Sequence, residues 1–266
     1  AEVHRVVEVE ALGLAQQVAE RKGTLPILGH ALIRADGHGR VTVSATDLAL
    51  SVTSDLSAGV QEVGGLTVDA GLFLEIVRQL PAEKFTLRRL ENGHAELSAG
   101  PKRVYRLVAL DQQDFPKMPA YGEADFQAVD PKALRYLLDL VGYALSTDES
   151  RPHLAGALLE RPPGKDGKLR LVGTDGHRMA IADADLPLRL PDHPVLIPRA
   201  GLKEIGRILG DAERAEVGFH QGHLFLRAGQ TVLGVKLLDF QFPPYEQVIP
   251  KAQPIVLKVK REDLLQ

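Results

Sequence analysis

Apolar and polar positions follow two different periods along this chain, and together they predict a mixture of strands and short helices. Apolar residues spaced three and four apart predict helices over 11–21 and 70–80, each with one apolar face. Alternation at every second position is typical of strands that are buried on one side. In the first half of the chain it marks the ranges 6–9, 28–34, 41–45, 48–53, 65–68, 84–90, 95–98 and 104–107.

The second half opens with a strong signal for the start of a helix. Asp130 occupies a capping position and Pro131 follows as the first helical residue, where its missing N–H costs nothing. The apolar residues that follow at helical spacing are Leu134, Leu137, Leu138 and Val141. Strands and turns then repeat the order of the first half, with a short helix expected over 201–209.

The two halves share the same motifs in the same order, which indicates an internal duplication. The run VSATD at 43–47 returns 128 residues later as LVGTD at 171–175. Three more pairs follow: 28–33 with 154–159, 66–72 with 195–202, and 114–116 with 241–243. A period of this length indicates repeated domains rather than the turns of a solenoid. Each unit is predicted to be α+β, with two helices packed on one face of antiparallel sheets.

The repeat also predicts the domain boundaries. We expect a first domain over 1–120 and a second over 121–252. A third start is expected at 253–266, because Val259 precedes an apolar stripe as Val9 and Val129 do in the earlier units. On this interpretation, residues 253–266 are the truncated beginning of a third domain.

Composition narrows the classes of protein that the chain can belong to. Charged residues make up 25% and hydrophobic residues 44%, as in ordinary globular proteins. The absence of cysteine excludes disulfides and Cys-ligated zinc, and it is compatible with the reducing cytoplasm where we expect the protein to be located. No apolar run is long enough for a membrane span, and the first residues lack a signal-peptide core. The histidines are scattered and no nucleotide-binding glycine motif is present, so we expect neither a metal nor a cofactor.

The charge of the predicted helices, and not the net charge of the chain, points to a nucleic-acid partner. The net charge is −3, but the predicted helices and their ends carry eight cations against five carboxylates. Such a surface suits contact with a DNA backbone, which is independent of sequence and sensitive to salt. No set of aromatic residues accompanies it, so single-strand binding is not expected. The cations are Arg21, Lys22, Arg78, Lys132, Arg135, Arg199, Lys203 and Arg207.

Three runs in combination resemble one known family. They are TLPILG at 24–29, TDGHR at 174–178 and FPPYEQVIP at 242–250, and the resemblance extends along the whole chain. The family is that of the bacterial DNA polymerase III β subunits, the sliding clamps. The resemblance implies tandem repeated DNA-clamp domains and a non-catalytic processivity factor for DNA replication. It also implies a homodimer ring of three-domain subunits, joined head to tail, whose helices surround double-stranded DNA.

The resemblance further implies a groove that binds short peptides from the polymerase catalytic subunit, the clamp loader and repair proteins. In the family, residues of the third domain complete this groove. The family ring also needs the first domain of each subunit to meet the third domain of its partner, so a chain cut before the third domain is expected to be a monomer or to associate weakly. Gln247 stands where the family often carries Arg. The matching positions are Leu154, Thr174, Gly176, His177, Arg178, Met179, Pro243, Gln247 and Val248.

The same matching implies positions that face DNA. Lys22, Arg151 and Arg199 occupy such places, while Pro152 and His153 stand where some members have aromatic residues. The helix residues Arg78, Lys132, Arg135 and Lys203 complete the expected DNA-facing set.

Two other functions stay open at this point. The first is a hydrolase or transferase that uses the Thr174–Arg178 segment, with His177 as base, Asp175 as its orienting partner and Arg178 beside them. The duplication argues against it, because Thr46-Asp47 recurs without a histidine and is better explained as a structural turn. The second is a protein-interaction scaffold without DNA binding, which salt-dependent binding to a duplex would exclude.

Overall fold

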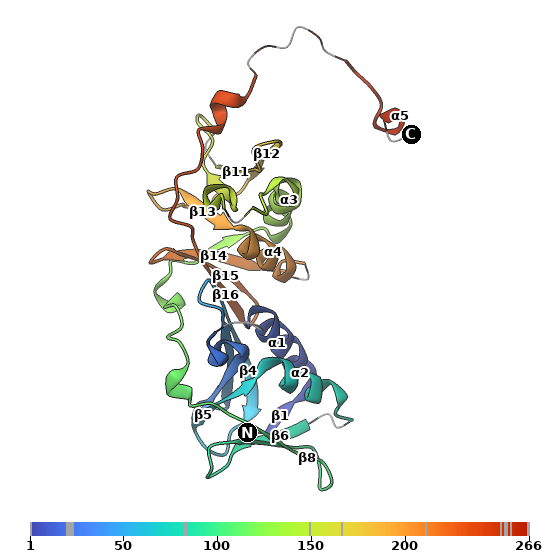
Figure 1. Ribbon diagram of the computed structural model, residues 1–266, viewed down its shortest axis with the longest axis vertical. Helices are drawn as coiled ribbons and strands as arrows, with labels where there is room; N and C mark the ends of the chain where they lie inside the picture. The colour runs from blue at the N-terminus through green and yellow to red at the C-terminus, as the bar shows by residue number, and fades with distance from the viewer. Residues whose placement is uncertain are drawn as a thin grey trace.

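The computed structural model describes residues 2–19, 24–81, 84–148, 150–165, 167–210, 212–250, 252, 255 and 257–264, with side chains of the first helix described from residue 9. The molecule is elongated, with two units arranged along its long axis and the N-terminal unit at the lower end of the view in Figure 1. No helix among the described residues is long and apolar enough to cross a lipid bilayer.

Among its described residues, the first unit contains two helices and eight strands. Their bounds are β1 (Glu2–His4), α1 (Arg5–Val18), β2 (His30–Ala35), β3 (Arg40–Thr46), β4 (Leu50–Gly59), β5 (Gly64–Asp69), α2 (Ala70–Gln79), β6 (Lys84–Arg89), β7 (Ala95–Ser98) and β8 (Val104–Leu107). The 3₁₀ turns η1 (Pro26–Gly29), η2 (Gln112–Asp114) and η3 (Tyr121–Glu123) lie before β2 and after β8.

The second unit repeats this order of elements. Its bounds are β9 (Gln127–Val129), α3 (Pro131–Val141), β10 (Gly156–Glu160), β11 (Lys168–Thr174), β12 (Met179–Asp185), β13 (Val195–Pro198), α4 (Arg199–Ile208), β14 (Ala215–His220), β15 (His223–Ala228) and β16 (Thr231–Lys236). The 3₁₀ turns are η4 (Gly142–Ala144), η5 (Pro152–Leu154) and η6 (Tyr245–Val248), and a short helix, α5 (Arg261–Leu264), follows.

Strand pairing confirms the duplication and the α+β class. In the first unit β2 pairs with β3 and β5, while in the second β10 pairs with β11 and β13. The hairpins β6–β7–β8 and β14–β15–β16 also match, and β1 pairs with β6 as β9 pairs with β14. All of these pairs are antiparallel. Both units therefore build the same sheets in the same order.

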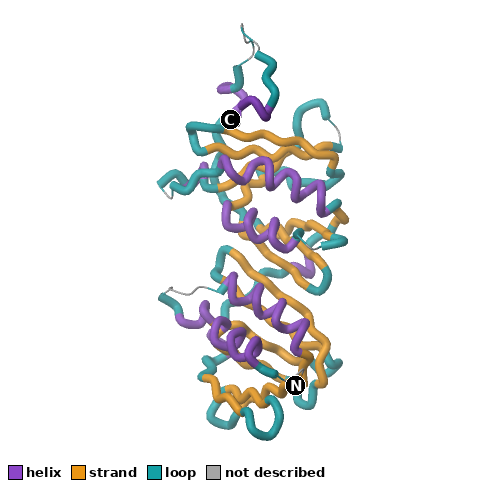
Figure 2. Tube along the Cα trace, turned by 90° about the vertical axis from the view of Figure 1, so that its right-hand side faces the viewer, coloured by secondary structure: helices purple, strands orange, loops and turns teal. Residues whose placement is uncertain are grey.

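The helices of both units lie on one side of the sheets (Figure 2). Each helix pair packs against strands through its apolar face, which forms a continuous core with the sheets. The predicted cap at Asp130 is confirmed, since its carboxylate accepts the Lys132 N–H at 2.9 Å. Asp69 caps α2 in the same way by accepting the Leu72 N–H at 2.7 Å.

The prediction for the first strand and helix is wrong in its boundaries. The strand expected over 6–9 is helical, because α1 begins at Arg5 and β1 occupies Glu2–His4. A short apolar run does not separate a strand from a buried helix by its period alone. Val9 therefore lies inside α1, whereas Val129 ends β9, so the two are not counterparts. The prediction of a third domain start at Val259 relied on Val9 and Val129 being equivalent, so the first unit no longer supports it.

The two units are joined by a strand pair that crosses between them. Strand β16 pairs antiparallel with β4, from Thr231 opposite Ser54 to Val235 opposite Leu50. The Ser54 and Thr231 hydroxyls lie 2.9 Å apart and form a hydrogen bond across this seam. A Cβ atom at Gly234 would stand 2.4 Å from the Ser51 Oγ, so the close approach requires glycine. One sheet of twelve described strands thus runs through both units.

Candidate peptide groove and DNA-facing helices

The turn between β11 and β12 is closed by its own side chains. The Thr174 hydroxyl accepts the Gly176 N–H at 3.1 Å and donates to the Arg178 carbonyl at 2.8 Å. The Asp175 carboxylate accepts the N–H groups of His177 and Arg178 at 2.9 and 3.0 Å, and the Arg178 Nε–H at 3.0 Å. The backbone N–H of His177, followed by that of Arg178, lowers the pKa of Asp175 to about 2. Asp175 is therefore a charged residue that forms the turn.

The first unit contains the same turn between β3 and β4. The Thr46 hydroxyl donates to the Leu50 carbonyl at 2.7 Å and accepts the Leu48 N–H at 3.0 Å. The Asp47 carboxylate accepts the N–H groups of Ala49 and Leu50 at 2.9 and 2.6 Å. The interpretation of Thr-Asp as a structural turn is confirmed, because the arrangement occurs without any histidine.

The side chain of His177 lacks the geometry of a catalytic base. The Asp175 carboxylate accepts hydrogen bonds from backbone N–H groups and from Arg178, and not from the imidazole. Within the part of the chain that the structure describes, no hydrogen bond joins the exposed His177 ring to a carboxylate. The arrangement instead leaves the imidazole at the surface, where it can contact a ligand.

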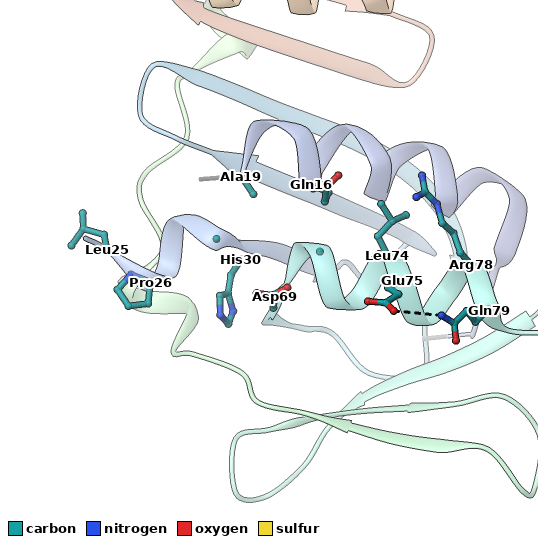
Figure 3. Close-up of a pocket in the computed structure, with 12 residues that line it drawn as sticks. Gln16, Ala19, Leu25, Pro26, His30, Asp69, Leu74, Glu75, Arg78 and Gln79 are labelled. Carbon is teal, nitrogen blue, oxygen red and sulfur yellow. Dashed lines mark hydrogen bonds between the residues drawn. The ribbon is translucent and has the colours of Figure 1, made fainter. Parts of the chain in front are cut away.

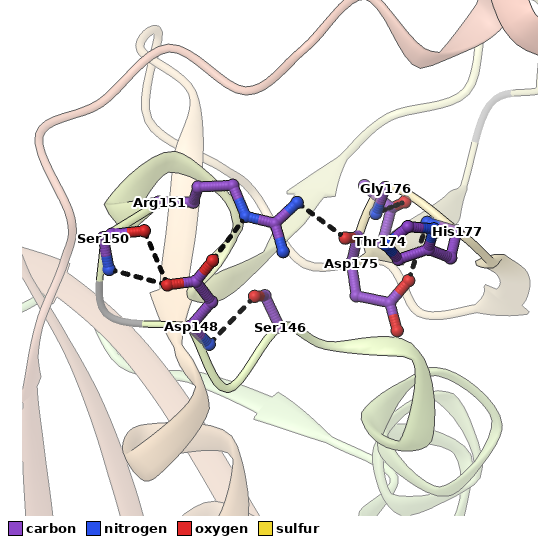
Figure 4. A network of polar contacts seen from close by, with 8 residues as sticks. All are labelled: Ser146, Asp148, Ser150, Arg151, Thr174, Asp175, Gly176 and His177. Carbon is purple, nitrogen blue, oxygen red and sulfur yellow. Dashed lines mark hydrogen bonds and ion pairs between the residues drawn. The ribbon is translucent and has the colours of Figure 1, made fainter.

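A polar network joins the loop before η5 to this turn (Figure 4). The Arg151 guanidinium donates through Nη1 to the Asp175 carbonyl at 3.1 Å and through Nε to Asp148 at 2.8 Å. Asp148 also accepts the N–H and hydroxyl of Ser150, and its N–H donates to the Ser146 hydroxyl. The Ser150 hydroxyl is the largest cause of a lowered pKa at Asp148. Arg151, which the resemblance assigned to the DNA side, thus supports the turn of the predicted groove.

The segment after β16 is fixed to the outer surface of the β10–β13 sheet. Phe242 and Tyr245 are buried against Leu158, Val172 and Leu196, with Met179 packed against the same cluster. Their rings meet edge to face, with centroids 6.3 Å apart. Met179, at the start of β12, therefore brings the Thr174–Met179 turn and the Pro243–Val248 segment together.

A row of polar side chains anchors the same segment from the sheet. The Tyr245 hydroxyl donates to Glu160 and accepts from Arg170 Nη1 at 3.4 Å. Arg170 forms two bonds to Asp183, at 2.7 and 3.0 Å, and Lys165 adds a third contact to Asp183 at 2.9 Å. The guanidinium holds the pKa of Asp183 well below its usual range. Burial, and then the Glu160 carboxylate, raise the pKa of Tyr245.

Sequence reasoning missed this anchoring row. Glu160 lies opposite Arg170 in the pairing of β10 with β11, and Arg170 lies opposite Asp183 in the pairing of β11 with β12. In the sequence, Arg170 lies between Leu169 and Leu171, a pattern that places its side chain on the polar face of a strand. Its partners became visible only with the strand register.

The other predicted groove residues differ in exposure. Leu154, the last residue of η5, is buried, and Thr174, Met179 and Pro243 are partly buried. Val248 is 71% exposed, so its apolar side chain is open to a ligand. The remaining exposed members are Gly176, His177, Arg178 and Gln247. The Arg178 guanidinium lies over the Tyr143 ring, 5.5 Å from its centroid.

Five of the predicted DNA-facing cations lie exposed on helices α2 to α4. These helices share one side of the molecule (Figure 2). Arg78 is on α2, Lys132 and Arg135 are on α3, and Arg199 and Lys203 are on α4. Lys22 lies outside the described residues.

A cleft of about 780 Å³ opens between α1, η1 and α2 of the first unit. Figure 3 shows Gln16 on α1 facing the Leu74–Gln79 part of α2, with His30 and Asp69 nearby. Burial lowers the pKa of His30, and Asp69 partly opposes that effect. The described residues contain no group of His, Asp and Glu that could hold a metal ion.

Comparisons with known proteins agree with this geometry. Residues 2–119 match the family model of the DNA polymerase III beta subunit, N-terminal domain, and residues 128–244 match that of its central domain. The beta sliding clamp of Caulobacter vibrioides is 33% identical over 265 residues, covering 98% of this chain and 71% of the relative. That of Pseudomonas aeruginosa is 32% identical over 267 residues, with the same coverage.

Solved structures give the same result. The chain superposes on Caulobacter crescentus pol III beta with a TM-score of 0.88 and 33% identity, covering 94% of this chain and 69% of that one. The DNA polymerase III subunit beta from Pseudomonas aeruginosa gives a TM-score of 0.85 at 29% identity, covering 94% and 68%. The chain therefore belongs to the family of bacterial beta sliding clamps, the non-catalytic processivity factors of DNA polymerase III.

Proposed function

We propose that this chain performs the clamp function through two separate surfaces. The helix side, formed by α1 to α4, contacts the backbones of double-stranded DNA without reading sequence. The groove, formed by the Thr174–Met179 turn and the Pro243–Val248 segment, receives short peptides from the polymerase catalytic subunit, the clamp loader and repair proteins.

The placement of all four helices on one side of both units carries the DNA proposal (Figure 2). Arg199 and Lys203 are exposed there, and phosphates are the groups that such cations bind without sequence preference. A duplex that passes this side can approach the helices of either unit. In the head-to-tail ring that the family resemblance implies, this side faces the enclosed DNA.

A charge reversal tests the DNA proposal. The chain is titrated onto a fluorescent duplex at several salt concentrations, beside the variant Lys132→Glu/Lys203→Glu. We expect binding that weakens steeply with salt, and a further large loss in the variant, because phosphates repel carboxylates. The matched control is Lys102→Glu/Lys236→Glu, which changes the net charge equally away from the helices. Equal losses in both variants would contradict the proposal, and so would an unchanged affinity in the helix variant.

The partly and fully exposed apolar residues beside an anchored turn support the peptide proposal. Met179, Pro243 and Val248 offer contacts for Leu or Phe side chains of a peptide. His177 and the backbone of its turn supply polar groups that orient the peptide. The anchoring of Tyr245 and the support from Arg151 hold both walls of this site in place before a peptide arrives.

His177→Ala tests the peptide proposal. We expect a peptide containing Gln, Leu and Phe to bind about five- to tenfold more weakly, the effect of losing roughly 1 kcal/mol of contact. His193→Ala, at an exposed loop position, is the matched control. Identical affinities of the two variants would contradict the assignment.

The two alternative functions make different predictions for the same samples. Substrate turnover by the unchanged chain that disappears in His177→Ala would favour an enzyme, which the geometry of Asp175 does not favour. Peptide binding without any binding to a duplex would favour an interaction scaffold. The proposed site of action is the cytoplasm, where bacterial DNA is replicated.

A further inference from the structure

We propose that the cleft between α3 and α4 holds one phosphate backbone of the duplex, and that the described residues of the first unit form no equivalent phosphate site. The DNA then rests against the second unit instead of passing midway between the two. This inference rests on the proposed DNA function and adds the location and the polarity of the contact.

The cleft between α3 and α4 has a volume of about 610 Å³ and is basic on both sides. Its lining includes small residues, Gly142 on one side and Ala200 and Gly206 on α4, which leave room for a phosphate to approach the helices closely. The cations in its lining are Arg135, Arg199, Lys203 and Arg207.

The cations of this cleft are only partly neutralised by carboxylates. Arg199 and Lys203 are exposed one helical turn apart, and no carboxylate among the described residues pairs with either. Arg135 meets Asp139 at 3.6 Å, but both side chains are substantially exposed, so water screens this pair. Only Arg207 has a buried partner, Glu204. Arg199 and Lys203 are therefore the groups most available to an anion.

The corresponding cleft of the first unit is lined differently. Its polar groups are mainly the amides of Gln16 and Gln79 and the carboxylates of Asp69 and Glu75. Arg78 is a cation in that lining, and it already has an interaction partner within the protein. A phosphate approaching this cleft would meet carboxylates as well as a guanidinium. The two clefts are related by the duplication but differ in charge.

The helices show the same difference in charge between the two units. The spans of α1 and α2 contain two cations and three carboxylates, whereas those of α3 and α4 contain five cations and two carboxylates. The net charge is therefore −1 over α1 and α2 and +3 over α3 and α4. The two helix pairs are adjacent and lie on the same side of the molecule. Because a phosphate row is attracted by local rather than total charge, the duplex is drawn toward α3 and α4.

The salt dependence of duplex binding tests this inference one charge at a time. Each phosphate contact contributes about 0.9 to the slope of log K against log salt concentration. We expect Arg199→Gln/Lys203→Gln to lower the slope by about 1.8, and Lys203→Gln alone by about 0.9. Arg78→Gln should lower it by clearly less than Lys203→Gln. The control Lys236→Gln lies on the opposite face of its strand from Val235, which packs against α4, and should leave the slope unchanged.

The possible outcomes separate this inference from the proposal beneath it. Equal slope losses for Arg78→Gln and Lys203→Gln would overturn the polarity while leaving DNA binding intact. If Arg199→Gln/Lys203→Gln has the same slope as the original chain, and the original chain binds in a salt-dependent way, the cleft between α3 and α4 is not the phosphate site. No salt-dependent binding by the unchanged chain would overturn both. Thermal melts of every variant confirm that folding is retained, since all four positions are exposed.

Discussion

At the scale of single residues, the two Thr-Asp turns share one unusual backbone conformation. Gly176 and Leu48 follow the aspartate in their turns and both have positive φ, 88° and 74°. Glycine adopts this conformation freely, whereas a leucine is strained there. The turn near the peptide groove is thus relaxed, and its duplicate in the first unit is not.

Substitutions at these two positions should have opposite effects on stability. Gly176→Ala adds strain and places a Cβ 3.2 Å from the Arg151 Nη1, so we expect a loss of about 1 kcal/mol and weaker peptide binding. Leu48→Gly removes strain from a side chain that is 55% exposed, and should be neutral or stabilising by up to about 1 kcal/mol. Urea unfolding of both variants measures this. Destabilisation of equal size at both positions would contradict the explanation.

The lowered pKa of Asp175 predicts a dependence of stability on pH. Its pKa falls from 3.8 to about 2 on folding, so its ionised form stabilises the fold above pH 4, and this stabilisation disappears as the pH falls toward 2. Asp175→Asn should therefore lower the urea midpoint at pH 7 and have little effect near pH 2. Asp192→Asn, in an exposed loop, is the control. A deficit in Asp175→Asn that is constant from pH 7 to pH 2 would contradict the assigned role.

At the scale of elements, a single hydroxyl connects the η6 segment to the sheet. Tyr245→Phe keeps the buried ring but leaves Glu160 without its donor and removes an acceptor from Arg170. We expect a loss of about 1 kcal/mol in stability and a several-fold loss in peptide affinity, because the segment shifts relative to Met179. Calorimetry with a peptide and a thermal melt separate the two effects. The control is Tyr136→Phe, whose ring is 55% exposed.

Weaker peptide binding in Tyr245→Phe should persist when the variant is measured far below its melting temperature. An affinity equal to that of the unchanged chain would show that the hydroxyl serves stability alone. The same loss in Tyr136→Phe would show that the effect is not specific to the anchor.

The elements that local chemistry determines could be predicted from the sequence, and those that depend on register could not. The Asp130 cap and the Thr174-Asp175 turn were predictable, because each is formed within a few residues. The row Glu160–Arg170–Asp183 was not, since it needs the pairing of three strands. The β4–β16 seam was not either, because Ser51 and Gly234 are 183 residues apart and neither position has a local signal for the other.

At the scale of the whole molecule, the seam predicts a global effect of one small substitution. Gly234→Ala would place a Cβ 2.4 Å from the Ser51 Oγ and 3.0 Å from the Phe225 ring. We expect a loss of about 1–3 kcal/mol, because the strands must separate or the ring must move. Gly64→Ala, with no atom within 4 Å of its new methyl group, is the control. Denaturant unfolding tests this, and equal stability of the two variants would contradict the close-packed seam.

The continuous sheet also determines how the molecule responds to a mechanical force. Backbone hydrogen bonds from Leu50 to Ser54 tie the two halves together edge to edge, in addition to the covalent connection. Such a junction resists hinge motion, since bending it would break several bonds at once. The angle between the halves is therefore set by strand twist, and elastic deformation must spread through both units instead of concentrating at a flexible linker.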